Sequence, residues 1–213
     1  MHSLHFHNSI IDIPPRKEFY PLQTLKNPSL PKETPPVPHV DGESLFWEMM
    51  TQSRTPDPWM YPALLSLKAS GKYLLAALSN TMIFPPSHPL SLSSPTDVRH
   101  IFDVMISSAH VGLRKPEPEI YKLALETVNK FAKQDERWKD RVPIEASEIL
   151  FLDDIGENCK AGREAGFGTV KVNLGRTYEA VDKLEEVTGL KLAGSHQRIP
   201  VKPVIRKPDG AKL

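Results

Sequence analysis

The chain has 213 residues, of which 39% are hydrophobic and 25% are charged, so it has the composition of an ordinary globular protein. A formal net charge of +1 gives no overall electrostatic reason to expect nucleic-acid or membrane partners. No apolar run approaches the ~20 residues that span a bilayer. The lone Cys159 excludes an intrachain disulfide, and without a signal-peptide pattern at Met1 the sequence predicts an intracellular protein.

Proline divides the chain into four parts. Eight of the 21 prolines lie in the first 40 residues, where they remove backbone donors and disfavour helix, so we expect residues 1–42 to form an irregular segment. Residues 43–70 are expected to be helical and residues 71–193 to form the core. The tail 194–213 lacks periodicity and is expected to be mobile. A second proline cluster predicts a loop over residues 82–95.

The expected elements begin with two short helices, 43–52 and 62–70, the second closed by Gly71. Strands then alternate with helices. The expected strands are 72–79, 103–107, 149–153 and 169–172, and the expected helices are 117–132, 158–165 and 178–187. This alternation predicts an α/β fold with a parallel, doubly wound sheet. In such sheets ligands bind beyond the carboxyl ends of the strands, so polar residues there are candidate site residues.

The first strand ends in Leu78-Ser79-Asn80-Thr81. Its hydroxyl and amide groups can donate hydrogen bonds to phosphate oxygens. The alternative is a simple turn built from Ser and Asn.

The loop 112–118 carries Lys115 between Arg114 and Pro116 and leads into the long helix. Pro116 and Pro118 stiffen this approach and hold the lysine in place. An ammonium beside a transferring phosphoryl group stabilises its negative charge. The alternative is a solvated lysine ahead of a helix.

The strand 149–153 reaches Asp153-Asp154. Two adjacent carboxylates repel each other and are costly to bury without a compensating cation. Magnesium takes oxygen ligands and commonly binds one or two carboxylates, so the pair predicts a Mg²⁺ site. A helix N-cap would explain one aspartate, but hardly both.

Taken in order, Ser79-Asn80, Arg114-Lys115-Pro116 and Phe151-Leu152-Asp153-Asp154 resemble the second, third and fourth motifs of the haloacid dehalogenase superfamily. Within it, the chain looks most like the amino-terminal phosphatase-type domain of soluble epoxide hydrolases and a related domain of an acyl-CoA dehydrogenase family. The match covers a little over half of the chain. It implies a Rossmann-like core with an incomplete doubly wound sheet over residues 71–193 and a remnant helical cap over residues 43–70.

The resemblance also implies roles for these residues. Ser79 and Asn80 would contact the phosphoryl group, Lys115 would stabilise its charge, and Asp154 would ligate magnesium with Asp153 beside it. Ser79, Lys115 and Asp154 would then be the catalytic set, with Asn158 supporting the loop. The ligand would be a small phosphorylated or otherwise anionic metabolite.

The superfamily's first motif is missing from this sequence. Its enzymes begin with an apolar strand ending in Asp-x-Asp, whose first aspartate attacks the substrate. No such motif lies ahead of Ser79, and the nearest imitation is Ile10-Ile11-Asp12, followed by Ile13 and Pro14. The missing motif also removes the central strand, which would leave backbone groups unpaired unless residues 4–13 or a partner fill the gap. A truncated gene product is therefore an alternative to a specialised protein.

The last three residues, Ala211-Lys212-Leu213, resemble the carboxyl-terminal peroxisomal address. They predict binding to the peroxisomal import receptor and a peroxisomal matrix location. A plain polar tail, with a cytoplasmic location, is the alternative.

Two functions compete on these observations. The first is a hydrolase domain of the magnesium-dependent phosphatase type, weakly active or inactive as encoded because the nucleophile is absent. The second is a non-catalytic interaction protein that uses the old active-site face or the exposed sheet edge.

Overall fold

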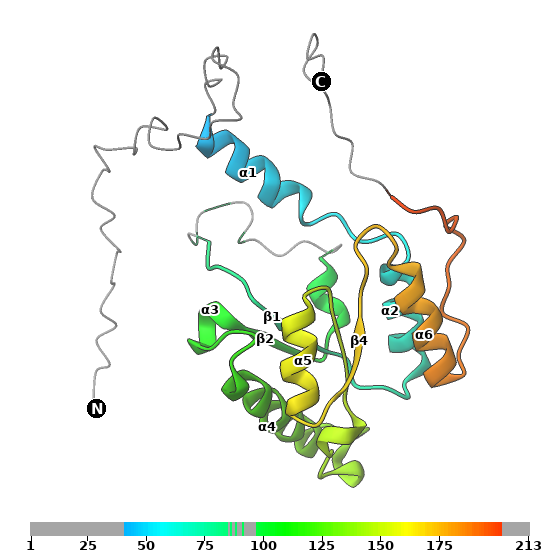
Figure 1. Ribbon diagram of the computed structural model, residues 1–213. Coiled ribbons are helices and arrows are strands. Elements are labelled where there is room, and N and C mark those ends of the chain that lie inside the picture. The colour runs from blue at the N-terminus through cyan, green and yellow to red at the C-terminus, as the bar shows by residue number, and fades with distance from the viewer. Residues whose placement is uncertain (1–40, 85, 87, 89–90, 92–96, 202–213) are drawn as a thin grey trace, which may run out of the picture. The chain divides into compact units, whose positions relative to one another are not determined.

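The computed structural model describes residues 41–84, 86, 88, 91 and 97–201 (Figure 1). The chain divides into two units, Met1–Leu45 and Phe46–Leu213. Helix α1 (Gly42–Gln52) crosses that boundary. The predictions for residues 1–40, for the last three residues and for much of the loop 82–95 lie outside the described residues. All that follows concerns the second unit.

Four short strands carry the fold. β1 (Ala76–Ser79) pairs in parallel with β2 (Val104–Ser107), and β3 (Leu150–Asp153) pairs in parallel with β4 (Gly168–Lys171). The register places Ser79 opposite Ser107 and Asp153 opposite Lys171. Within the described part of the chain, the strands thus form two separate two-stranded sheets. The predicted α/β fold with parallel strands is confirmed.

Helices connect these strands. α2 (Met60–Ser70) precedes β1 and closes on Gly71 at φ 64°, the left-handed conformation expected of a helix-ending glycine. The one-turn helix α3 (Ser108–Val111) follows β2, and α4 (Pro118–Gln134) links it towards β3. α5 (Gly156–Glu164) and α6 (Tyr178–Thr188) complete the alternation. Short 3₁₀ turns span Val98–Ile101, Lys139–Arg141 and Ala146–Glu148.

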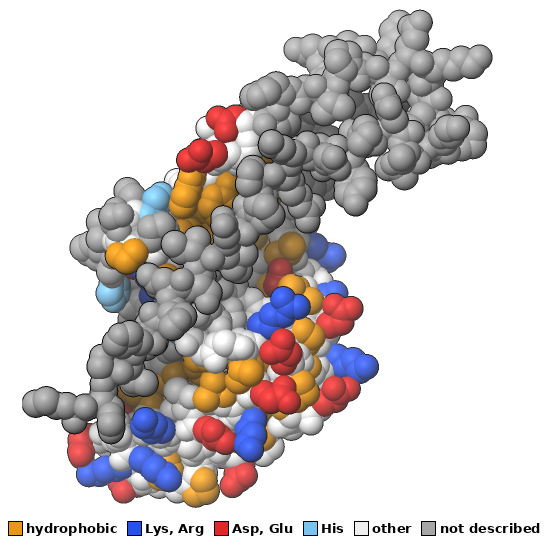
Figure 2. Space-filling view, turned by 90° about the vertical axis from the view of Figure 1, so that its left-hand side faces the viewer, with side chains coloured by type: hydrophobic (Ala, Val, Ile, Leu, Met, Phe, Trp, Pro, Cys, Tyr) orange, Lys and Arg blue, Asp and Glu red, His pale blue; other side chains and the backbone are white. Residues whose placement is uncertain are grey.

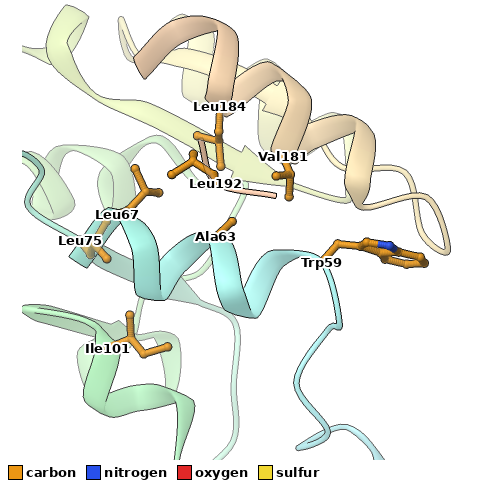
Figure 3. Packing of buried hydrophobic residues seen from close by; sticks show 8 residues of the cluster. All are labelled: Trp59, Ala63, Leu67, Leu75, Ile101, Val181, Leu184 and Leu192. Atoms are coloured by element: carbon orange, nitrogen blue, oxygen red, sulfur yellow. The ribbon is translucent and has the colours of Figure 1, made fainter. Parts of the chain in front are cut away.

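The helices cover both faces of the strands. α2 and α6 lie on one side, and α4 and α5 on the other (Figure 1). On the side of α2 and α6, Leu150 and Leu152 of β3 pack against a cluster of buried residues. Figure 3 shows this cluster: Trp59, Ala63, Leu67, Leu75, Ile101, Val181, Leu184 and Leu192. On the other face, Leu78 of β1 and Phe151 of β3 share a core with Ile120, Tyr121 and Phe167. The two half-sheets therefore belong to one three-layer core.

The inner edges of β1 and β3 can be identified from the printed backbone bonds. The carbonyl of Leu75 accepts hydrogen bonds from the N–H groups of Asp103 and Val104, so the backbone polar groups of Leu75 point towards β2. Backbone N–H and C=O groups point to opposite sides in successive strand residues, so those of Ala76 and Leu78 point away from β2. The carbonyl of Asp153 accepts from the Val172 N–H on the β4 side, so the backbone polar groups of Leu150 and Leu152 point away from β4. None of these four apolar residues is fully buried. No described strand pairs with either inner edge.

The element boundaries differ from prediction where pairing or packing decides them. The first strand was expected from Lys72 but begins at Ala76, because its partner β2 begins only at Val104. Just before the strand, the Leu75 N–H is satisfied by the side chain of Asp103 instead. The last helix of the core runs one residue further than the expected end at Val187.

Residues 194–201 make specific contacts with this core. The indole Nε1 of Trp59 donates to Gln197 O at 3.1 Å, and Val201 N donates to Gly175 O at 2.8 Å. Arg198 forms an ion pair with Asp182 at 2.7 Å. This part of the predicted tail therefore lies against α2 and α6, and residues 202–213 lie outside the described part.

The described helices include none long and apolar enough to cross a membrane. Acidic and basic side chains are interspersed on the face shown in Figure 2, as the near-neutral sequence predicts.

Candidate functional site

Lys115 joins the carboxyl ends of the two inner strands. Its Nζ donates to Leu78 O of β1 at 2.7 Å and to the Oδ2 of Asp153 of β3 at 2.6 Å. The ammonium also lies 5.4 Å from the centroid of the Phe151 ring. Only 10% of the lysine side chain is exposed. The solvated-lysine alternative is therefore wrong, because the charge is held where strands β1 and β3 end.

Asp153 is buried and fully engaged. Its Oδ1 accepts from the Ile155 N–H at 2.8 Å and from Nδ2 of Asn158 at 2.9 Å, while Oδ2 accepts from Lys115. Burial opposes ionisation and is the largest single effect on this group, but the donors together hold the pKa of Asp153 below its ordinary value. The cation that compensates this buried carboxylate is thus the Lys115 ammonium.

Asp154 differs from its neighbour in that it is exposed. Its carboxylate has no hydrogen-bond partner within the described residues, and it does not cap α5, which begins after Ile155. The premise that two carboxylates are buried side by side is corrected here: one is buried against a lysine, and the other faces solvent.

The side chain of Asn80 binds the backbone of Lys115. Its Oδ1 accepts from the Lys115 N–H at 2.9 Å, and its Nδ2 donates to the Lys115 carbonyl at 2.9 Å. Asn80 follows directly after β1, so these two bonds tie the lysine loop to the end of that strand.

A cluster of hydroxyl groups lies at the ends of β1 and β2. The hydroxyls of Thr81 and Ser107 are 2.7 Å apart, and Nδ1 of His110 lies 3.0 Å from the Ser107 hydroxyl. The hydroxyl of Ser108 accepts from the Thr81 N–H at 3.0 Å. Sequence reasoning missed Ser107, Ser108 and His110, although Ser107 ends its strand just as Ser79 does.

Asn158 and Tyr121 support the loop after β3. Asn158 is buried, and its carbonyl accepts from the hydroxyl of Tyr121 at 2.9 Å. Burial, helped by the nearby charge of Asp153, raises the pKa of Tyr121 to about 12. Cys159 is also buried, and burial raises the pKa of its thiol. A buried free thiol of this kind serves as a small packing residue.

The structure thus brings Ser79, Asn80, Lys115 and Asp153 together at one edge, with Asp154 in the loop that follows. Asp12, the nearest imitation of a nucleophile, lies outside the described residues. Within them, no group of three or more His, Cys, Asp or Glu side chains could hold a metal ion. The exposed carboxylate of Asp154 beside Asp153 still fits magnesium, which commonly binds through one or two carboxylates and keeps several waters.

Comparison with known proteins identifies the family. The family model described as haloacid dehalogenase-like hydrolase matches residues 18–166. The chain belongs to this hydrolase family. The matched range includes Ser79, Lys115 and Asp153.

Relatives of this haloacid dehalogenase-like chain are much longer proteins. It is 30% identical over 161 residues to bifunctional epoxide hydrolase 2 of Sus scrofa, covering 69% of this chain and 26% of that one. It is 28% identical over 166 residues to acyl-CoA dehydrogenase family member 10 of Mus musculus, covering 77% and 13%. The chain therefore spans about a quarter or less of these relatives, and both were anticipated by the sequence resemblance.

Among solved structures, the chain resembles a HAD family enzyme from Bacteroides thetaiotaomicron in complex with magnesium and inorganic phosphate. The two share 26% identity with a TM-score of 0.40, over 57% of this chain and 56% of the other. A protein from Corynebacterium glutamicum is 18% identical with a TM-score of 0.46, over 62% and 82%.

Proposed function

We propose that the edge formed by Ser79, Lys115 and Asp154 binds Mg²⁺ and the phosphate group of a small metabolite, as in the magnesium-dependent phosphatase type of this family. The observation that supports this most strongly is the Lys115 ammonium, which is held by Leu78 O and Asp153 at the ends of both inner strands. A fixed ammonium stabilises the charge of a phosphoryl group without reorganising on binding. Ser79 ends β1 at the same edge and supplies a hydroxyl donor.

Magnesium, when bound, would neutralise phosphate charge, and the exposed Asp154 carboxylate would hold it. Asp153 sits beside it as the predicted second acid. Three hydrogen bonds already occupy Asp153, so its main role in this chain is to hold Lys115 and order the Asp154 loop through the Ile155 N–H.

Chemical turnover in this proposal is weak or absent. Phosphoryl transfer in this family needs an aspartate nucleophile, and the 213-residue sequence has no Asp-x-Asp strand ahead of Ser79. Binding and chemistry use different groups, so loss of the nucleophile leaves anion binding in place.

Two measurements test this proposal. Titration with inorganic phosphate and Mg²⁺ in a calorimeter should show binding that Lys115→Ala weakens at least tenfold, as expected for a charge-assisted bond of about 1.5 kcal/mol or more. Lys122→Ala, an exposed lysine on α4, is the matched control and should leave binding unchanged. Hydrolysis of p-nitrophenyl phosphate should be near background. Robust turnover that Asp12→Asn abolishes would overturn the claim of weak chemistry.

The second candidate function is non-catalytic binding of a partner through the inner sheet edges. The observation that favours it concerns the backbone groups on the inner edges of β1 and β3. No described strand pairs with these groups, which belong to Ala76, Leu78, Leu150 and Leu152. Unpaired parallel strands are templates for an added strand, and a partner would contribute an extended apolar segment.

This second function makes a different prediction for mutations. Ala76→Pro places a proline on the inner edge, where it removes an N–H that an added strand would use. It should abolish association with a co-purifying partner, whereas Lys115→Ala and Asp154→Ala should leave association intact. A monomer that retains no partner would refute it.

The predicted peroxisomal address rests on the last three residues, which lie outside the described part of the chain. We propose that it directs import of this domain. An amino-terminal fluorescent fusion should enter peroxisomes and should become diffuse when Leu213 is deleted. A diffuse signal from the intact fusion would contradict the proposal.

A further inference from the structure

We infer that Asn80 is a positioning residue that fixes Lys115 for anion binding, and that it does not itself contact the anion. The inference rests on the proposed phosphate site and changes the role that the family resemblance implies for Asn80. It follows from the hydrogen bonds of the Asn80 side-chain amide. Its oxygen accepts from the Lys115 N–H, and its nitrogen donates to the Lys115 carbonyl.

The two bonds form a clamp with the geometry of a backbone pair. A side-chain amide offers an acceptor and donors on one planar group, as a peptide unit does, so it can hold both the N–H and the C=O of one residue. Asn80 forms both bonds with the backbone of Lys115, each at 2.9 Å. The lysine backbone is therefore fixed relative to the end of β1, which Asn80 directly follows.

The far end of the same lysine returns to the same strand. Its Nζ donates to Leu78 O, two residues before Asn80, and to Asp153. β1 therefore holds Lys115 at both ends, by the Asn80 amide at the backbone and by a carbonyl at the ammonium. Loss of the Asn80 bonds leaves the hydrogen bonds of the ammonium in place but releases the backbone of Lys115. The fraction of molecules with the ammonium held at the strand ends should therefore fall.

The chain contains a matched clamp far along the sequence from this site. The Asn129 side chain accepts from the Ile144 N–H at 2.7 Å and donates to the Ile144 carbonyl at 2.9 Å. Asn129→Ala therefore removes an equivalent pair of bonds, together with the bond from Nδ2 to Leu125 O at 3.1 Å, without touching Lys115, and it controls for general destabilisation.

The first experiment measures Lys115 directly and needs no phosphate. The folded chain is acylated with a limiting amount of acetic anhydride, and modification of Lys115 relative to the exposed Lys122 is read by mass spectrometry. Asn80→Ala should raise relative Lys115 labelling about fivefold, as expected for losing roughly 1 kcal/mol of hydrogen bonding that opposes local opening. Asn129→Ala should leave it unchanged.

Equal labelling of Lys115 in wild type and Asn80→Ala would overturn the inference. Should Asn80→Ala fold poorly, Asn80→Asp serves instead. It keeps an acceptor for the Lys115 N–H and places a carboxylate oxygen against the Lys115 carbonyl, so labelling should again increase.

The second experiment is a double-mutant cycle on phosphate affinity with Mg²⁺ present. Asn80→Ala should weaken binding by up to about fivefold in the wild-type background and have no further effect in Lys115→Ala, because it acts through the lysine. Additive losses would show that Asn80 contacts the anion and would overturn the inference. Absence of phosphate binding by the wild-type chain would refute the proposed function, and the labelling result would still decide the role of Asn80.

Discussion

Lys115 combines an ion pair, a backbone hydrogen bond and an aromatic contact in one side chain. Its partner Asp153 is buried, and the negative charge is stable there because of the ammonium and two neutral donors. A buried ion pair gains little over an apolar pair, but removing one partner leaves an uncompensated charge. The stability of the strand ends therefore depends on both residues being present.

Replacement of Lys115 by Met should lower the free energy of unfolding by about 3 kcal/mol at pH 7, because Asp153 is then buried without a cation. Adding Asp153→Asn should recover part of this loss. Urea denaturation of the single and double variants measures both effects. Lys122→Met, at an exposed position of α4, is the control, and an equal loss in that variant would contradict the prediction.

Sequence could identify these residues but not their partners. Pro116 and Pro118 after Lys115, and the acids after an apolar strand, single these residues out, and strand ends of a parallel sheet meet at one edge. The Lys115–Asp153 bond joins residues 38 positions apart. The spacing of the residues does not reveal that bond. The sequence therefore predicted a metal ion as the cation for both acids, whereas Lys115 is the cation that compensates Asp153.

Asp97 provides a test of pH dependence away from the site. A side-chain bond from Arg99 is the largest of the effects that lower its pKa to about 2, against 3.8 ordinarily. A depressed pKa contributes stability that is present above pH 4 and lost as the pH falls towards 2. Arg99→Met should therefore cost about 1 kcal/mol at pH 6, allowing for solvent screening, and almost nothing at pH 2. Urea unfolding at both pH values measures this, and an equal cost at both would contradict it.

At the scale of elements, α5 packs closely against β3 and β4. A Cβ at Gly162 would lie 3.0 Å from Cδ1 of Phe151 and 3.3 Å from Cγ2 of Thr169. The sequence predicted this helix over residues 158–165. It could not predict that Gly162 is the contact point, because a glycine inside a helix looks unfavourable until its neighbours are known.

Gly162→Ala should destabilise the fold by about 1 kcal/mol. Overpacking costs about 1–3 kcal/mol, and the gain in helix propensity of at most ~1 kcal/mol offsets only part of it. Gly156→Ala, at the start of the same helix, meets no atom within 4 Å and should be neutral or slightly stabilising. Thermal unfolding of the two variants distinguishes these outcomes, and equal melting temperatures would show that Phe151 moves aside at no cost.

At the scale of the whole molecule, the missing first motif has a structural counterpart. The described sheet is divided between β1 and β3, and Lys115 is the group that links their ends. The sequence predicted parallel strands alternating with helices, and this is confirmed; within the described residues these strands form two separate pairs. Which backbone groups face the open edges could not be predicted, since it depends on the register of β1 with β2 and of β3 with β4.

Paired proline variants test whether the inner edge of β1 is open in solution. Ala76 faces away from β2, so Ala76→Pro removes no bond to that strand, and it should cost less than about 1 kcal/mol. Ala77 faces β2, so Ala77→Pro removes a bond of the ladder and should cost about 3 kcal/mol. Chemical denaturation of both variants measures the difference. Equal and large losses would mean that another segment or a partner pairs with Ala76, and the sheet would then be complete in solution.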